Sequence, residues 1–176
     1  MEKIWLKNYP QGVPHEIDMS TYENIYDIFH QAQNKFPDHI AFSNMGVELS
    51  FSELKLKIDL TASFFQNHLG LKKGDAIALQ MPNVLQYPIF LFAALKIGLV
   101  VVNTNPLYTS KEMLHQFNDS QVKAVIILEN FAHLLQEILP KTKIKHVIVT
   151  GIADLFPFPK SLIVNSVIKY IKKMVK

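Results

Sequence analysis

The 176-residue chain contains no cysteine, and this absence excludes several kinds of chemistry. Without thiols the chain forms no disulfide framework, no thiolate metal site and no cysteine nucleophile, and it fits a reducing compartment. The seven histidines are scattered without the i, i+4 spacing that places two metal ligands on one face of a helix. The sequence therefore predicts a cytoplasmic protein with no metal site of its own.

Glycine is also scarce, with six residues in the whole chain. No pair of glycines has the spacing of a dinucleotide-binding or Walker-type loop, whose backbone amides would cradle phosphates. The chain also lacks the G-x-S-x-G turn that exposes a nucleophilic serine. We therefore assign no catalytic residue and expect no cofactor to be bound by these residues alone.

Long hydrophobic runs are missing as well. The most apolar stretch, residues 87–102, is shorter than the roughly 20 residues of a membrane span and contains Pro88, Lys96 and Gly98. Residues 1–10 do not read as a secretory signal. A net charge of +3 gives no reason to expect a nucleic-acid partner. Apolar residues make up 49% of the chain and include twelve phenylalanines, enough for the core of one ordinary domain.

Helices and strands alternate in the predicted secondary structure. Three pairs, Ser20–Glu23, Ser50–Glu53 and Thr109–Glu112, have the capping-box spacing that begins a helix. Residues 41–51 predict two short strands around a turn at Gly46. The later predicted strands are runs of Val, Ile and Leu in which apolar and polar residues do not alternate. Such runs are typical of strands covered on both sides. The fold class is therefore α/β, an open, mainly parallel sheet with helices on both faces. The predicted strands of this sheet are residues 76–79, 99–102, 124–128 and 146–150.

We divide the chain into a partial α/β subdomain, residues 1–150, and a loop with a basic amphipathic helix, residues 151–176. The apolar side of this helix is predicted to contain Val164, Val167, Ile168, Ile171 and Val175. The opposite side gathers Lys169, Lys172, Lys173 and Lys176. The helix either packs on the body of the protein or lies on an anionic membrane surface, where the four lysines would contact lipid headgroups. Because the periodic pattern continues to Lys176, we expect the chain to be truncated there.

Short strings in a fixed order carry a family resemblance. Residues 49–54, Leu-Ser-Phe-Ser-Glu-Leu, and residues 95–98, Leu-Lys-Ile-Gly, resemble two core motifs of the adenylate-forming acyl-CoA synthetases. The strings between and beyond these motifs resemble the bacterial-type long-chain fatty-acid–CoA ligases, in particular their N-terminal portion. These strings are 71–75 (LKKGD), 81–83 (MPN), 86–88 (QYP), 105–109 (NPLYT), 118–120 (NDS), 130–133 (NFAH) and 169–173 (KYIKK).

The resemblance implies an AMP-forming reaction in the complete enzyme. A fatty acid reacts with ATP to give an acyl-adenylate and pyrophosphate, and coenzyme A then displaces AMP; Mg²⁺ is implied with ATP. The phosphate-binding loop and the catalytic lysine of such enzymes have no counterpart in these residues. The resemblance transfers only a loop that follows a predicted strand, where an α/β sheet usually contacts ligands. The candidate substrate-side residues of this loop are Asn103, Thr104, Asn105, Pro106 and Tyr108, which also suit a structural turn.

Two functions remain open at this point. The chain is either an N-terminal fragment of a long-chain fatty-acid–CoA ligase, inactive alone because the ATP-binding loop is missing, or a non-enzymatic module that binds acyl chains or membrane. Peripheral attachment to the inner face of the membrane fits either function. The sequence does not predict the oligomeric state.

Overall fold

A computed structural model describes residues 2–18 and 20–175. The helices of the main body are α1 (Ile25–Lys35), α2 (Phe51–Asn67), α3 (Gln86–Lys96), α4 (Ser110–Asp119), α5 (Ala132–Ile138) and α6 (Lys160–Ser166). The strands are β1 (Ile40–Asn44), β2 (Val47–Ser50), β3 (Ala76–Gln80), β4 (Val100–Asn103), β5 (Ala124–Leu128) and β6 (His146–Thr150). Short 3-10 turns lie at η1 (Ile4–Asn8), η2 (Glu129–Phe131) and η3 (Leu139–Lys141), and a π-helical segment, η4 (Val167–Ile171), extends α6.

Four strands form one parallel sheet in the order β4-β3-β5-β6. The chain moves from β3 to β4 at one edge and then returns to the other side of β3 to add β5 and β6. This reversal makes the junction of β3 and β5 the topological switch point of the sheet. The separate antiparallel hairpin β1–β2 turns at Met45 and Gly46, both of which have positive φ.

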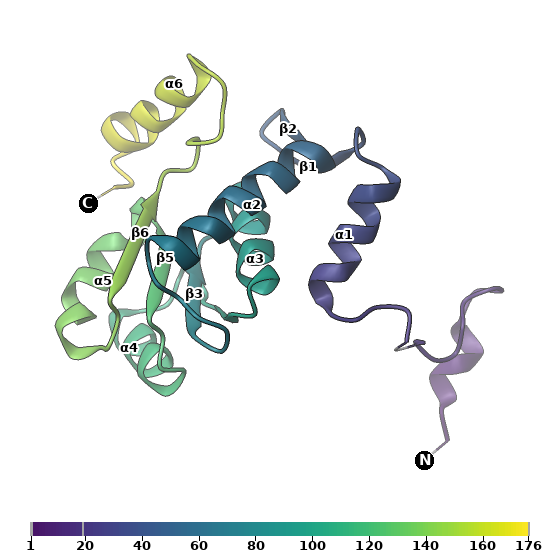
Figure 1. The fold of residues 1–176 in the computed structure, drawn as a ribbon. Helices are drawn as coiled ribbons and strands as arrows, with labels where there is room; N and C mark the ends of the chain where they lie inside the picture. The colour runs from purple at the N-terminus through teal and green to yellow at the C-terminus, as the bar shows by residue number, and fades with distance from the viewer. Residues whose placement is uncertain (1, 19, 176) are drawn as a thin grey trace.

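Helices cover both faces of the sheet (Figure 1). On one face, α1, α2 and α3 pack around Ile77, Leu79 and Ile126. On the other face, α4 and α5 pack against Val125 and Ile127. Every residue of β3 and β5 is buried, which explains the absence of in–out alternation in their sequences. The predicted fold class is confirmed.

Helix caps fix the start of α2 and α4. The Ser50 and Thr109 side chains accept from the amides of Glu53 and Glu112, and each glutamate accepts in return from the amide of its cap residue. These hydrogen bonds from the cap residues hold the pKa values of Glu53 and Glu112 below their ordinary range. Two of the three predicted capping boxes are therefore confirmed.

The third predicted capping box is wrong. The amide and hydroxyl of Ser20 donate to the Asp18 carboxylate at 2.9 and 2.6 Å, so Ser20 belongs to a local turn. Helix α1 begins later, where the Asn24 side chain accepts from the Asp27 amide at 3.1 Å. A nearer acceptor for the serine and a second good cap residue explain the difference.

The last helix also differs from its prediction. It ends at Ile171, not at the end of the chain, because Lys173 takes a positive φ of 51°. The Lys172 amide donates to the Val167 carbonyl at 2.8 Å, and the Met174 amide donates to the Ile168 carbonyl at 3.1 Å. These two hydrogen bonds span five and six residues, more than the four of an α-helix. They close the end of the helix and satisfy two of its last carbonyls.

Candidate functional site

The loop after β4 contains the five predicted substrate-side residues. Asn103 is exposed, and its side-chain oxygen accepts from the Tyr87 hydroxyl at 2.8 Å. The Asn105 side chain accepts from the Leu107 amide at 3.0 Å, the arrangement of an Asx turn. The side-chain oxygens of both asparagines therefore already accept hydrogen bonds within the protein.

The other three residues of this loop lie deeper. Thr104 is buried, and its amide continues the sheet ladder by donating to the Leu79 carbonyl at 3.0 Å. Pro106 is half-buried, and Tyr108 packs against the core cluster under α4. Hydrogen bonds and packing thus hold the loop in place. Of its five predicted contact residues, Asn103 and Asn105 are the most accessible to solvent.

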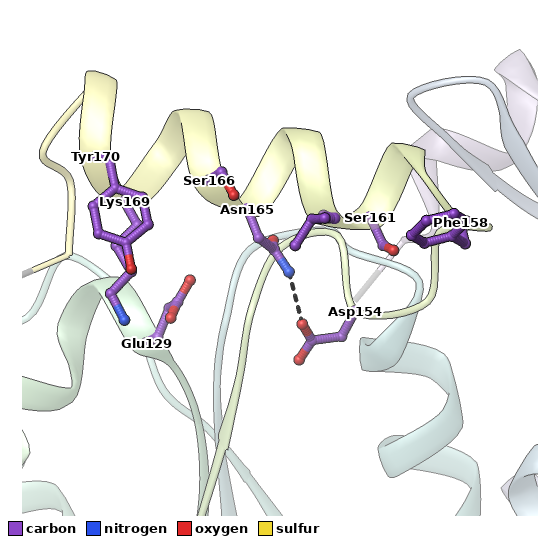
Figure 2. Close-up of a pocket in the computed structure, with 9 residues that line it drawn as sticks. Glu129, Asp154, Phe158, Ser161, Asn165, Ser166, Lys169 and Tyr170 are labelled. Atoms are coloured by element: carbon purple, nitrogen blue, oxygen red, sulfur yellow. Dashed lines mark hydrogen bonds between the residues drawn. The ribbon is translucent and has the colours of Figure 1, made fainter.

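A groove of about 560 Å³ lies under α6, at the carboxyl ends of β5 and β6 (Figure 2). Its lower side carries two acids, Glu129 and Asp154. The helix contributes polar and apolar side chains from above, and Phe158 stands at one end. The helical residues that line the groove are Ser161, Leu162, Asn165, Ser166, Lys169 and Tyr170.

Asp154 joins the helix to the sheet. One carboxylate oxygen accepts from the Gly151 amide at 2.6 Å and from the Thr150 hydroxyl at 3.0 Å. The other oxygen accepts from the Asn165 side chain at 2.9 Å, the hydrogen bond drawn in Figure 2. Asn165 also accepts from the Ala153 amide at 3.0 Å. Asp154 and Asn165 therefore hold the start of the last segment against the end of β6.

We expect Asp154→Ala to loosen α6 without unfolding the sheet. Removing a charged acceptor of three hydrogen bonds on an exposed residue should cost about 1–2 kcal/mol of local stability. In hydrogen exchange, the α6 amides should exchange roughly 5–30 times faster while β3 and β5 keep their protection. Asp119→Ala, which removes an exposed acid at the end of α4, is the matched control. Unchanged exchange in α6 would show that apolar contacts alone hold the helix.

The charges of the groove fit neither a triphosphate nor its metal. Two carboxylates would face the phosphates, with Lys169 as the ammonium among the lining residues. Both oxygens of Asp154 are already engaged, which leaves Glu129 as the available carboxylate. In the part of the chain that the structure describes, no three His, Asp or Glu side chains gather as a metal site would require. We therefore derive no chemical step through ATP or Mg²⁺ from these residues.

The structure separates the two predicted contact regions. The loop follows β4 and the groove adjoins β6, and these strands form opposite edges of the sheet. Among the predicted membrane lysines, Lys169 lines the groove, while Lys172 and Lys173 are exposed beyond it. Lys176 lies outside the described residues.

Sequence reasoning missed Gln80, the last residue of β3. Its side chain is 0% exposed, and neither amide atom has a hydrogen-bond partner among the residues that the structure describes. Gln80 follows the buried residues 76–79 and lies at the switch point of the sheet. The sequence did contain a signal for this residue, because Gln80 is a polar residue that directly follows the apolar run of residues 76–79.

The chain matches the family described as AMP-binding enzyme over residues 29–173. A curated relative, the long-chain-fatty-acid–CoA ligase of Escherichia coli O6:H1, is 46% identical over 175 residues. That alignment covers 99% of this chain and 31% of the relative. The chain therefore spans about a third of the length of the curated relatives that it matches.

Solved structures agree with this result. An anthranilate CoA ligase in complex with anthranoyl-AMP superposes with a TM-score of 0.72 at 19% identity, over 76% of this chain and 27% of that one. At this identity, the likeness shows the fold alone. The N-terminal domain of FACL13 from Mycobacterium tuberculosis superposes with a TM-score of 0.68 at 25% identity, over 72% of this chain and 33% of that one. From the ordered motifs, the parallel sheet and these matches, it follows that the chain belongs to the AMP-binding enzyme family.

Proposed function

We propose that the chain is the N-terminal part of a long-chain fatty-acid–CoA ligase, whose complete form joins a fatty acid to coenzyme A with ATP and Mg²⁺. The observation that carries the proposal is 46% identity over 99% of the chain to a ligase with this name. The part played by these residues is structural. They build the parallel sheet and present the Asn103–Tyr108 loop at its carboxyl edge, where α/β sheets contact ligands.

A chimera tests this proposal. The 175 aligned residues of this chain replace the matching segment of the Escherichia coli ligase, and the product is assayed for palmitoyl-CoA formation. We expect activity within about tenfold of the parent, because no catalytic residue is assigned to the exchanged segment and its identity to the relative is 46%. A chimera that folds, as judged by circular dichroism, but forms no acyl-CoA would contradict the proposal.

The 176-residue chain alone is expected to release no pyrophosphate from ATP, palmitate and Mg²⁺. Its residues supply neither a glycine-rich phosphate loop nor a cluster of cationic donors in the groove, so charge that develops on a phosphate would go unstabilised. The chimera serves as the positive control in the same assay. Acyl-adenylate formed by the chain alone would overturn the expected inactivity and leave the family assignment intact.

A second function has its own supporting observation. We propose that the chain also makes peripheral contact with the inner face of a membrane, either within the ligase or as a module that binds membrane or acyl chains without catalysis. Lys169, Lys172 and Lys173 are exposed close to several exposed apolar side chains. No helix among residues 2–18 and 20–175 has the length and hydropathy needed to cross a bilayer, so the proposed contact is interfacial.

Sedimentation with vesicles tests this contact. The chain should sediment with vesicles that contain phosphatidylglycerol and remain in the supernatant with phosphatidylcholine alone, because the lysines need an anionic surface. Raising the salt concentration should weaken the binding. Equal sedimentation with both kinds of vesicle would count against a contact made by lysines.

A further inference from the structure

Apolar side chains are unusually exposed along the last segment of the chain. Phe158 is 82% exposed and Ile171 is 72% exposed, whereas the core residues of the sheet are close to zero. We define the α6 surface as the six large apolar residues of this segment that solvent reaches. They are Phe158, Leu162, Ile163, Tyr170, Ile171 and Met174.

The predicted apolar side of the helix is not the exposed one. Val164 packs against the main core cluster, and Val167 and Ile168 are half-buried. Of the predicted stripe, Ile171 alone is strongly exposed and belongs to the α6 surface. The helix therefore already uses one apolar side against the protein and retains a second for another contact.

The charged residues of the last segment itself have one sign. Residues 155–175 contain no aspartate and no glutamate, and Lys169, Lys172 and Lys173 are all exposed. The neighbouring acids, Glu129 and Asp154, lie on the sheet side of the groove, beneath the helix (Figure 2). Lys160 is directed elsewhere, since its ammonium donates to the Met45 carbonyl at 2.5 Å. Phe158, Leu162, Lys169 and Tyr170 line the groove, so the surface outside it offers the ammonium groups of Lys172 and Lys173 together with the apolar side chains of Ile163, Ile171 and Met174.

We infer that the α6 surface is the part of the molecule that docks on an anionic lipid bilayer, an inference that rests on the membrane contact proposed above. A bilayer interface supplies phosphates for the lysines and hydrocarbon for the isoleucines within a few ångströms of each other. Tyr170 suits the boundary between them, because its ring is apolar and its hydroxyl is polar. Ile163, Ile171 and Met174, with Lys172 and Lys173, do not line the groove and make the main contact with the lipid, while Asp154 and Asn165 keep the helix attached to the sheet.

The lysines are tested by a triple variant of the 176-residue chain, Lys169→Gln, Lys172→Gln and Lys173→Gln. Binding to vesicles of phosphatidylglycerol and phosphatidylcholine should weaken about fivefold for each lysine, and hence about a hundredfold in total. The matched control is Lys141→Gln, Lys143→Gln and Lys145→Gln, which removes the same charge from exposed positions just before β6. This control should bind within about threefold of the wild type, because its lysines lie outside the docking surface.

The apolar residues are tested by Ile163→Ser with Ile171→Ser. Vesicle binding should fall at least about tenfold, since both side chains lose their burial in the interface. Leu56→Ser with Leu60→Ser is the control, because these leucines of α2 are 62% and 64% exposed and lie outside the α6 surface. The thermal unfolding of each variant, followed by circular dichroism, identifies any loss that comes from misfolding.

A fluorescent reporter shows the depth of the contact. The chain has one tryptophan, so Tyr170→Trp in a Trp5→Phe background places the only indole on the α6 surface. Its emission should shift to shorter wavelength on anionic vesicles, as the ring leaves water. The parent chain, with Trp5 alone, should show a smaller shift.

The outcomes separate the surface from the membrane contact itself. Equal losses in the two lysine triples, with no shift in the emission of the Tyr170→Trp reporter, would overturn the α6 surface and leave a general electrostatic contact. No vesicle binding by the wild type would overturn both. Concentration-dependent dimers that Ile163→Ser and Ile171→Ser dissociate, without vesicle binding, would assign the surface to a second copy of the chain and so overturn the inference.

Discussion

Phe65→Ala is expected to destabilise the chain by about 3–5 kcal/mol, the usual cost of truncating a fully buried phenylalanine. The Phe65 ring is 0% exposed in the main core cluster and stacks on Phe90 with ring centroids 6.2 Å apart. Alanine favours helix more than phenylalanine does, so the loss would come from packing and not from the backbone of α2. Because domains are commonly stable by about 5–15 kcal/mol, this single change should remove a large part of the total.

The adjacent residue provides the control. Phe64 is 40% exposed and stacks on His68 at 5.5 Å, on the outer side of the same helix. Phe64→Ala should cost less than about 1 kcal/mol. Urea unfolding followed by circular dichroism measures both variants. Similar losses of unfolding free energy for Phe65→Ala and Phe64→Ala would mean that the side of α2 that contains Phe65 does not face the core.

Gln80→Met is expected to stabilise the chain by about 1–3 kcal/mol. The buried amide of Gln80 lacks a hydrogen-bond partner among the described residues, so its burial is uncompensated. Methionine has a similar length and flexibility and brings no polar amide into the sheet. The midpoint of urea unfolding should therefore rise while the slope stays unchanged.

Gln86→Met tests the same exchange where the amide is engaged. Gln86 is also buried, but its side-chain nitrogen donates to the Gly151 carbonyl at 2.7 Å and to the Thr150 hydroxyl at 3.3 Å. This variant should lose about 1–3 kcal/mol, because two buried acceptors lose their donor. A gain in stability for Gln80→Met together with a loss for Gln86→Met would show that the Gln80 amide lacks a partner and that the Gln86 amide has one. A loss at Gln80 equal to that at Gln86 would show that the Gln80 amide is hydrogen-bonded in solution.

Local patterns predicted most of the fold because they depend on neighbours in the sequence. Ser50 and Thr109 begin helices through a glutamate three residues later, and the buried strands show as short runs of Val and Ile. Ser20 has the same spacing but forms no cap, because Asp18 captures its hydroxyl and Asn24 provides another cap residue. The choice between two nearby capping residues depends on the path of the chain before α1, which the spacing does not encode.

The candidate site depended more on tertiary structure. The sequence placed the Asn103–Tyr108 loop after a strand, but the partners of Asn103 come from α3 and α4. The groove under α6 brings together Glu129 and Lys169, which are distant in the sequence. The helical pattern of residues 162–175 likewise gave no means of choosing which apolar side would pack on the core. Packing partners of this kind come from the assembled sheet.

The strand order also has a consequence for the chain during its synthesis. β3 pairs with β4 on one side, but its other partner, β5, begins 21 residues after the end of β4, between Asn103 and Ala124. At a synthesis rate of about 5–20 residues per second, the second edge of β3 waits roughly 1–4 s for its partner. During that interval Ile77 and Leu79 belong to an open, apolar strand edge on the nascent chain, where binding by a chaperone would protect them from mispairing.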